Sequence, residues 1–67
     1  MTMYLVDKSK RLLGSCVEYI DGWRFIPAVT SRKTSRKAWS SAVEAIPKWA
    51  FDVADDLLTL DEWMATQ

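Results

Sequence analysis

Carboxylates are the titratable side chains that cluster most clearly in this sequence. The cluster lies in the C-terminal third and comprises Asp52, Asp55, Asp56, Asp61 and Glu62. On a helix, Asp52 and Asp56 would share one face at a spacing of four residues, where they could bind a hard cation weakly. The loop pattern that calcium sites use is missing from the sequence, so we expect a solvated acidic face rather than a metal site.

Nucleophilic catalysis has little support in this composition. The chain contains no histidine and one cysteine, so it has no Ser-His or Cys-His pair, no internal disulfide and no zinc site of the usual Cys/His type. Cys16 lies in the middle of a predicted strand, where we expect a small buried hydrophobic residue. A chain of 67 residues also leaves little room for a ligand pocket. We therefore predict a non-enzymatic protein with no cofactor and no small-molecule substrate.

A basic loop could contact phosphate groups. Four cations lie within six positions: Arg32, Lys33, Arg36 and Lys37. They could hold the backbone of a nucleic acid while Trp23 or Phe25 stacks on its bases. An acidic protein surface would fit the same loop, and a solvated loop without any partner is the simplest alternative.

Opposite charges are concentrated in the two halves of the chain, although the formal net charge is zero. Residues 1–37 carry eight Lys or Arg against three Asp or Glu, whereas residues 38–67 carry one against six. The halves can neutralise each other by packing together, or they can leave a basic end for an anionic partner. No apolar run approaches the roughly 18–20 residues of a membrane span, and a signal-peptide pattern is missing. We therefore expect a soluble, cytoplasmic protein that does not enter a membrane.

The N-terminal half predicts three antiparallel strands. Residues 2–7 and 12–20 are rich in β-prone types and are separated by a polar turn. Asp21-Gly22 then predicts a type I′ hairpin turn that leads into a third strand over residues 23–30. Pro27 cannot donate a hydrogen bond to a neighbouring strand, so we expect this strand at an edge, or Pro27 facing away from its partner.

A two-residue turn at Asp21-Gly22 would also set which residues face each other. The pairs on one face would be Ile20 with Trp23, Glu18 with Phe25, and Cys16 with Pro27. The pairs on the other face would be Tyr19 with Arg24, Val17 with Ile26, and Ser15 with Ala28. Both faces would be partly apolar, and one helix covers only one of them. The second face would bind a partner or a second copy of the chain, unless the C-terminal segment wraps around it.

The C-terminal half predicts a helix that contains a proline. Apolar residues recur at intervals of three and four from Trp39 to Leu57, as on one face of an amphipathic helix. Ser41 and Glu44 fit a capping box at its start. Because a proline inside a helix removes a hydrogen bond, we predict a kinked or broken helix over about 41–57, with Trp49 near the kink at Pro47.

A short final helix is predicted over about 60–65. Thr59 fits the N-cap position and Glu62 the N3 position of a second capping box. Leu58 and Trp63 have the spacing of a hydrophobic staple around that cap. Two capping devices at one point favour a helix even in so short a segment.

Three short motifs follow one another within residues 12–50. They are GWRFIP from Gly22, Ser-Arg-Lys at 35–37, and EAIPKWA at 44–50. This order resembles small uncharacterised open reading frames of phages and prophages. The resemblance implies a β-hairpin sheet with one packed helix and no assigned activity. It supplies no binding or catalytic residue, and the tail from Phe51 lies outside the pattern.

These features predict a single small α+β domain over residues 1–67, in which a three-stranded antiparallel meander packs on the Pro-kinked helix and a short C-terminal helix follows. The predicted function is that of a phage or prophage accessory protein that binds a host or phage protein, or a second copy of itself, through an apolar sheet face. A small nucleic-acid-binding module is the alternative. The predicted binding residues are Tyr19, Trp23, Arg24, Phe25, Arg32, Lys33, Arg36 and Lys37.

Overall fold

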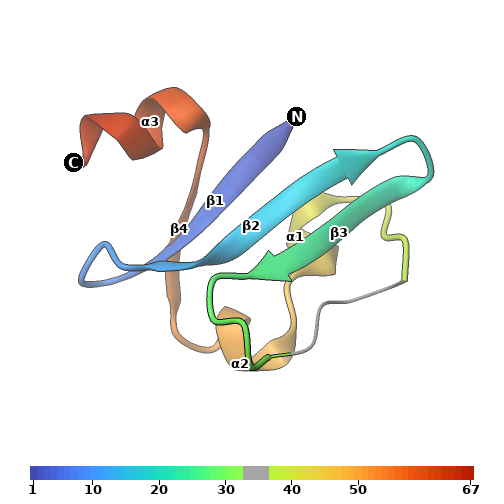
Figure 1. Cartoon of the computed structure of the whole chain (residues 1–67), viewed down its shortest axis with the longest axis horizontal. Coiled ribbons are helices and arrows are strands. Elements are labelled where there is room, and N and C mark those ends of the chain that lie inside the picture. The colour runs from blue at the N-terminus through green and yellow to red at the C-terminus, as the bar shows by residue number, and fades with distance from the viewer. Residues whose placement is uncertain (33–36) are drawn as a thin grey trace.

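The computed structural model describes residues 1–32 and 37–67 of the chain. In these residues an antiparallel sheet of four strands is combined with three short helices, which confirms the predicted α+β class (Figure 1). The elements are β1 (Thr2–Asp7), β2 (Leu12–Tyr19), β3 (Gly22–Pro27), α1 (Ala42–Ala45), α2 (Lys48–Phe51), β4 (Ala54–Leu58) and α3 (Leu60–Ala65). The strand order is β3-β2-β1-β4, so β3 and β4 form the two edges.

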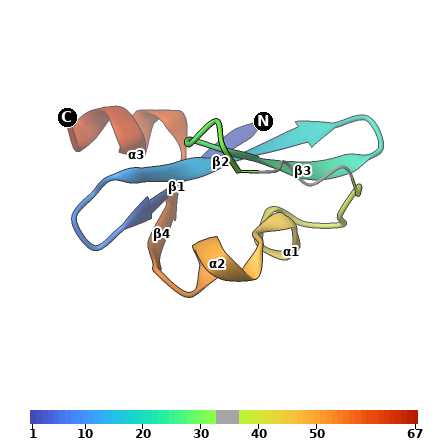
Figure 2. The same ribbon diagram turned by 60° about the horizontal axis from the view of Figure 1, so that its bottom comes forward.

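The helices lie on opposite sides of the sheet (Figure 2). Helices α1 and α2 cover one face, which we call the helix face, and α3 lies on the other side against β1 and β4. The core lies between the sheet and α1 and α2. Its buried members are Leu5, Cys16, Phe25, Ala45 and Ala50. We call the opposite side of the sheet the Tyr19 face, because residues alternate along a strand and Tyr19 has the opposite parity to Cys16.

The fourth strand corrects the prediction of a three-stranded sheet. Strands β1, β2 and β3 pair in chain order, as a meander does, but residues 54–58 then pair with the free side of β1. The sequence predicted a helix through Leu57. A run as short as Ala54–Leu58 does not distinguish helix from strand by periodicity, and pairing with β1 decides in favour of the strand.

Pro47 breaks the predicted helix into two four-residue helices. Ile46 ends α1 in an extended conformation with ψ 120°, as expected for a residue that precedes proline. Pro47 is then the N-cap of α2, where a missing N–H costs little. The predicted cap of α1 is confirmed, because Glu44 N–H donates to Ser41 Oγ at 3.2 Å. The Glu44 carboxylate instead accepts a hydrogen bond from the Ser40 hydroxyl.

The C-terminal helix α3 forms where the capping box predicted it. Glu62 N–H donates to Thr59 Oγ1 at 3.3 Å, and Thr59 N–H donates to Glu62 Oε1 at 2.9 Å. The hydrogen bond from the Thr59 backbone lowers the pKa of Glu62, because it stabilises the carboxylate. Trp63 of α3 stacks on Tyr4 of β1, with ring centroids 6.1 Å apart.

The β2–β3 hairpin has a different turn from the predicted one. Ile20 and Asp21 form the tip, and Tyr19 pairs with Gly22. Within this turn only Gly22 has a positive φ, at 129°, whereas a type I′ turn needs a positive φ at both central residues. The β-branched Ile20 would be strained at a positive φ. In the observed turn the positive φ falls on Gly22, directly after the tip, and glycine has no side chain to oppose it.

The change of turn shifts the register by two residues relative to the prediction. Cys16 faces Phe25, Glu18 faces Trp23, and Gly14 faces Pro27. A shift of two keeps each side chain on its predicted face, because strand side chains alternate with a period of two. The assignment of residues to the two faces was therefore right, although the individual pairs were wrong.

Gly14 provides the space that this register needs. A Cβ atom added at Gly14 would lie 2.3 Å from Cζ of Phe25 and 2.7 Å from the Ile26 carbonyl oxygen. The Phe25 ring therefore occupies the volume that a side chain at position 14 would fill. With Cys16 opposite Phe25, both side chains are fully buried in the core.

Strand β3 lies at an edge, as Pro27 predicted. The Trp23 N–H donates to the Trp39 carbonyl at 2.8 Å, and Trp39 N–H donates to the Trp23 carbonyl at 3.0 Å, on the side of β3 that faces away from β2. Pro27 lies four residues further along the strand, so its nitrogen points outward too. Its missing N–H therefore removes no hydrogen bond to β2.

Replacing Gly14 with Ala should destabilise the fold by about 1–3 kcal/mol, because the methyl group has to displace the Phe25 ring or the Ile26 carbonyl. Urea unfolding followed by tryptophan fluorescence measures this change. The matched control is Ser15→Ala on the opposite face of β2, for which we expect a change of about 0.5 kcal/mol or less. Equal stabilities of the two variants would contradict the packing of Phe25 against Gly14.

Candidate partner-binding surface

The described residues cover the Tyr19 face of the sheet over only half of its width. Helix α3 packs on β1 and β4, and beneath it Val6 and Leu58 are buried. On β2 and β3, by contrast, Tyr19 is 43% exposed and Ile26 is 39% exposed. We call this half the open half of the Tyr19 face, and define it by Ser15, Val17, Tyr19, Arg24 and Ile26.

Arg24 lies across this open half in a fixed position. Its guanidinium carbon is 4.9 Å from the centroid of the Tyr19 ring, and its Nη2 forms an ion pair with the Asp21 carboxylate at the hairpin tip. Within the described residues, Arg24 Nε is buried and has no hydrogen-bond partner. A side chain held by both an aromatic ring and a carboxylate loses little further freedom when a partner binds.

The other two predicted aromatic residues lie on the opposite, helix face. Phe25 is fully buried, and its ring meets Trp49 edge to face at a centroid distance of 5.8 Å. Its predicted role at a binding surface is therefore incompatible with this structure. Trp23 is half-buried and packs against the same core, beside its backbone bridge to Trp39. Only Tyr19 and Arg24 of the four predicted strand residues share an open surface.

The basic loop is described at its two ends only. Lys33 and Arg36 lie outside the described residues. The Arg32 guanidinium carbon lies 4.1 Å from the centroid of the Trp49 ring, and Lys37 Nζ lies 5.1 Å from that of Trp39. Both cations therefore contact tryptophans that pack against the helix-face core.

Sequence reasoning did not include Val17 and Ile26 among the binding residues, although strand alternation had placed them on the same face as Tyr19. It also missed the pairing of loop cations with Trp39 and Trp49. Nothing in the local sequence indicates that pairing, because it depends on how the helices pack on the sheet.

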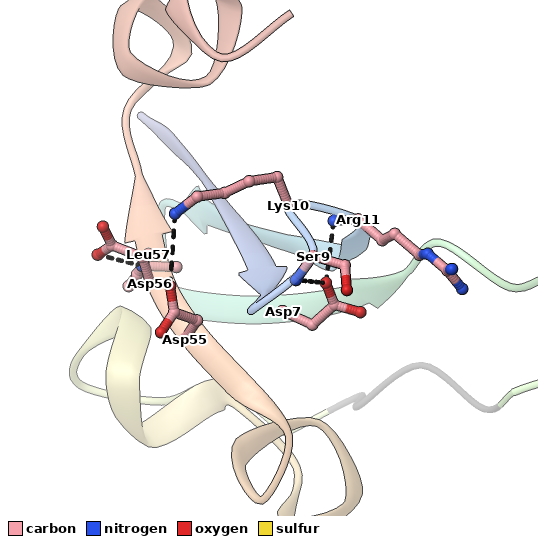
Figure 3. A network of polar contacts seen from close by, with 7 residues as sticks. All are labelled: Asp7, Ser9, Lys10, Arg11, Asp55, Asp56 and Leu57. Carbon is pink, nitrogen blue, oxygen red and sulfur yellow. Dashed lines mark hydrogen bonds and ion pairs between the residues drawn. The ribbon is translucent and has the colours of Figure 1, made fainter.

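The acidic residues do not form a metal site in the part of the chain that the structure describes, where no group of three or more His, Cys, Asp or Glu could hold a metal ion. Asp52 and Asp56 do not share a helix face, because residues 54–58 form β4. Lys48 Nζ lies 3.0 Å from Asp52 Oδ2. Lys10 reaches Asp55 at 3.4 Å, and Asp56 accepts from Leu57 N–H at 2.9 Å on the side of β4 that faces away from Lys10 (Figure 3).

Cys16 is an inert core residue, as its place in a strand predicted. It is fully buried, and its Sγ donates to the Ala42 carbonyl at 3.4 Å. Burial raises the pKa of the thiol from 9.0 to about 11, because the charged thiolate would lose its hydration. The nucleophilic form is therefore scarce at neutral pH.

Comparisons with protein-family models, with curated proteins and with solved structures give no match to this chain. Among residues 1–32 and 37–67, no helix is both long enough and apolar enough to cross a membrane.

The Cys16 thiol should react with iodoacetamide at pH 8 at least about a hundredfold more slowly in the folded chain than in urea. The reason is that a pKa of about 11 leaves only about one thiol in a thousand ionised at this pH, and burial also blocks access. Mass spectrometry of timed samples measures the rates. Because ionisation favours the unfolded thiol, stability should also fall as the pH rises above 9.0. Rapid alkylation of the folded chain would show that Cys16 is accessible.

Proposed function

We propose that this chain is a non-enzymatic accessory protein that binds another protein through the open half of the Tyr19 face. One observation carries the proposal: α3 covers the β1–β4 half of this face and leaves Tyr19 and Ile26 exposed on β2 and β3. The phage or prophage origin belongs to the same proposal and is supported by the resemblance of residues 12–50 alone.

The open half has the residue types that dominate protein–protein interfaces. Tyr and Arg are enriched among interface residues with large binding contributions, and here they contact each other beside the apolar Val17 and Ile26. The ion pair with Asp21 uses Nη2 of Arg24, so other donors of the guanidinium are left for acceptors at the edge of the interface. The partner that fits is a protein surface with apolar side chains at its centre and carboxylate or carbonyl oxygens beside them.

The strands give this surface a rigid base. Arg24 and Ile26 belong to β3, which is hydrogen-bonded to β2 along its length, and Phe25 between them is anchored in the core. Side chains fixed in this way reach a partner without first ordering the backbone, which reduces the entropic cost of binding. A loop of the same composition would lack this advantage.

Replacing Tyr19 and Ile26 together with Ser should weaken partner binding by at least about tenfold, because the two exposed apolar contacts of this surface are lost. The partner is isolated by affinity capture from a host lysate, and its dissociation constant is then measured by calorimetry with purified proteins. Ile20 and Val29 are also exposed but lie outside the open half, so the Ile20→Ser/Val29→Ser variant is the matched control. An equal loss of affinity in both variants, or no loss in either, would contradict the proposed surface.

Nucleic-acid binding is a second candidate function, and one observation favours it. Arg32 lies over Trp49 and Lys37 over Trp39, so each described end of the basic loop places a cation beside an aromatic ring. Proteins that bind single strands combine cations for the phosphates with aromatic rings for the bases. In this chain the cations cover the rings, which would have to separate before a base could stack.

The proposed protein-binding role predicts no measurable affinity for a mixed pool of DNA and RNA at low salt. Fluorescence anisotropy at low and at moderate salt tests this, because binding through phosphates weakens steeply with salt. A strongly salt-dependent affinity that disappears when Arg32, Lys33, Arg36 and Lys37 are changed to Ala would favour the nucleic-acid function instead. The Lys10→Ala/Arg11→Ala variant, which changes cations of another loop, is the control.

A further inference from the structure

The two edges of the sheet differ in their availability to another strand. The outer edge of β3 is bridged to Trp39 at Trp23, and it ends at Pro27, which cannot donate a hydrogen bond. On the opposite edge, β4 has no strand beside it other than β1 within residues 1–32 and 37–67. An extended segment can therefore join the sheet at β4 without displacing another strand of the described chain.

A groove runs along β4 on the helix face. Its volume is about 350 Å³, and its apolar lining comes from Leu5, Val43, Ile46, Phe51, Ala54 and Leu57. Phe51 is 58% exposed and Val43 is 56% exposed, and both line the groove together with the buried Leu5. The groove therefore offers large apolar side chains to water at the same edge where a strand can pair.

The rim of the groove is acidic. Asp55 and Asp56 line it, both on β4. The ion pair of Asp55 with Lys10, at 3.4 Å, lies at the surface, where such pairs contribute little. Asp56 accepts a hydrogen bond from the neighbouring Leu57 N–H, so one backbone donor of this edge strand is bonded to a side chain. A segment with cations beside its apolar residue would complement this rim.

The same carboxylates argue against a second copy of the chain as the occupant. If β4 paired antiparallel with β4 of another copy about its centre, Asp56 would face Asp56, and a shift of one residue would place Asp55 against Asp56. Like charges directly opposite each other destabilise a strand pair. Charged edge residues are a common means by which proteins prevent such self-association.

We propose that β4 and its groove bind an extended basic segment of a partner protein. The segment adds to the sheet as a strand beside β4, places one apolar side chain in the groove against Phe51 and Val43, and directs Lys or Arg toward Asp55 and Asp56. A carbonyl of the incoming strand replaces Asp56 as the acceptor of Leu57 N–H, and the freed carboxylate pairs with the cation. Strand addition of this kind obtains affinity from main-chain hydrogen bonds and specificity from side-chain pockets.

Selection from a phage-displayed library of random linear peptides on the immobilised chain tests this site. We expect enriched peptides in which Lys or Arg alternates with large apolar residues. One such peptide is then synthesised and titrated into the ¹⁵N-labelled chain. Its largest chemical-shift changes should fall on residues 54–58 and on Phe51 and Val43, and its affinity should decrease with salt, since exposed charges are screened.

Two variants separate the contributions of the groove and of the rim. Phe51→Ser should weaken peptide binding at least about tenfold, because the apolar contact is removed. Asp55→Asn/Asp56→Asn should weaken peptide binding by a similar factor, because the charges are removed while an oxygen that can accept from Leu57 N–H is retained. Leu60→Ser is the matched control, because Leu60 is 51% exposed but lies on α3. Circular dichroism confirms that each variant is folded, and Val43→Ser replaces Phe51→Ser if the latter is not.

Several results would overturn the proposal. The selection could enrich no peptide, or it could enrich peptides without basic residues. The chemical-shift changes could also be centred on Tyr19 and Ile26 rather than on β4. Self-association of the unmodified chain in sedimentation, if Asp55→Asn/Asp56→Asn strengthens it, would identify a second copy as the occupant instead. Because this site lies on the other face of the sheet, its failure would leave the function proposed for the Tyr19 face untouched.

Discussion

The packing of the Phe25 ring over Gly14 is the contact on which the arrangement of this small sheet depends. A side chain at position 14 would collide with the ring, so glycine there lets Phe25 lie opposite Cys16 with both fully buried. This pairing fixes the register of β2 and β3. It directs Trp23 toward α1 and α2, and by the alternation of a strand it directs Arg24 and Ile26 to the other face. The exposed surface is thus a consequence of what the core requires.

The shortness of the helices explains why that surface is left open. A domain of this size buries a smaller share of its surface than a larger one, and here two four-residue helices are needed to cover one face. Among the helices of residues 1–32 and 37–67, α3 is the one that lies on the Tyr19 face. Its capping box starts the helix immediately after β4, so it lies over β1 and β4, where Trp63 stacks on Tyr4. It does not extend to β2 and β3.

The sequence predicted features that depend on neighbouring residues and missed those that depend on distant ones. Strands β1 and β2, the break at Pro47 and the cap at Thr59 follow from local chemistry, and Tyr19 and Arg24 were correctly placed on one face. The predicted turn type was wrong because a type I′ turn at Asp21-Gly22 would pair Phe25 with Glu18. In the structure the Phe25 ring packs over Gly14, which requires Phe25 to pair with Cys16 instead. Strand β4 was missed because its pairing with β1 spans about fifty residues, and Phe25 was assigned to a surface because strand aromatics look alike in sequence.

The two proposed binding surfaces differ in chemistry as well as in position. The open half of the Tyr19 face combines an arginine with apolar side chains on β2 and β3, whereas the groove beside β4 combines carboxylates with apolar side chains on the helix face. They lie on opposite faces of one hydrogen-bonded sheet and toward opposite edges of it. A ligand at one surface would therefore not block the other surface. Ligands of opposite charge at the two surfaces would also not repel each other. The two proposed surfaces would together suit a protein that holds an acidic-rimmed partner on one side of the sheet and a basic extended segment on the other, and the rigid sheet between them would set the distance.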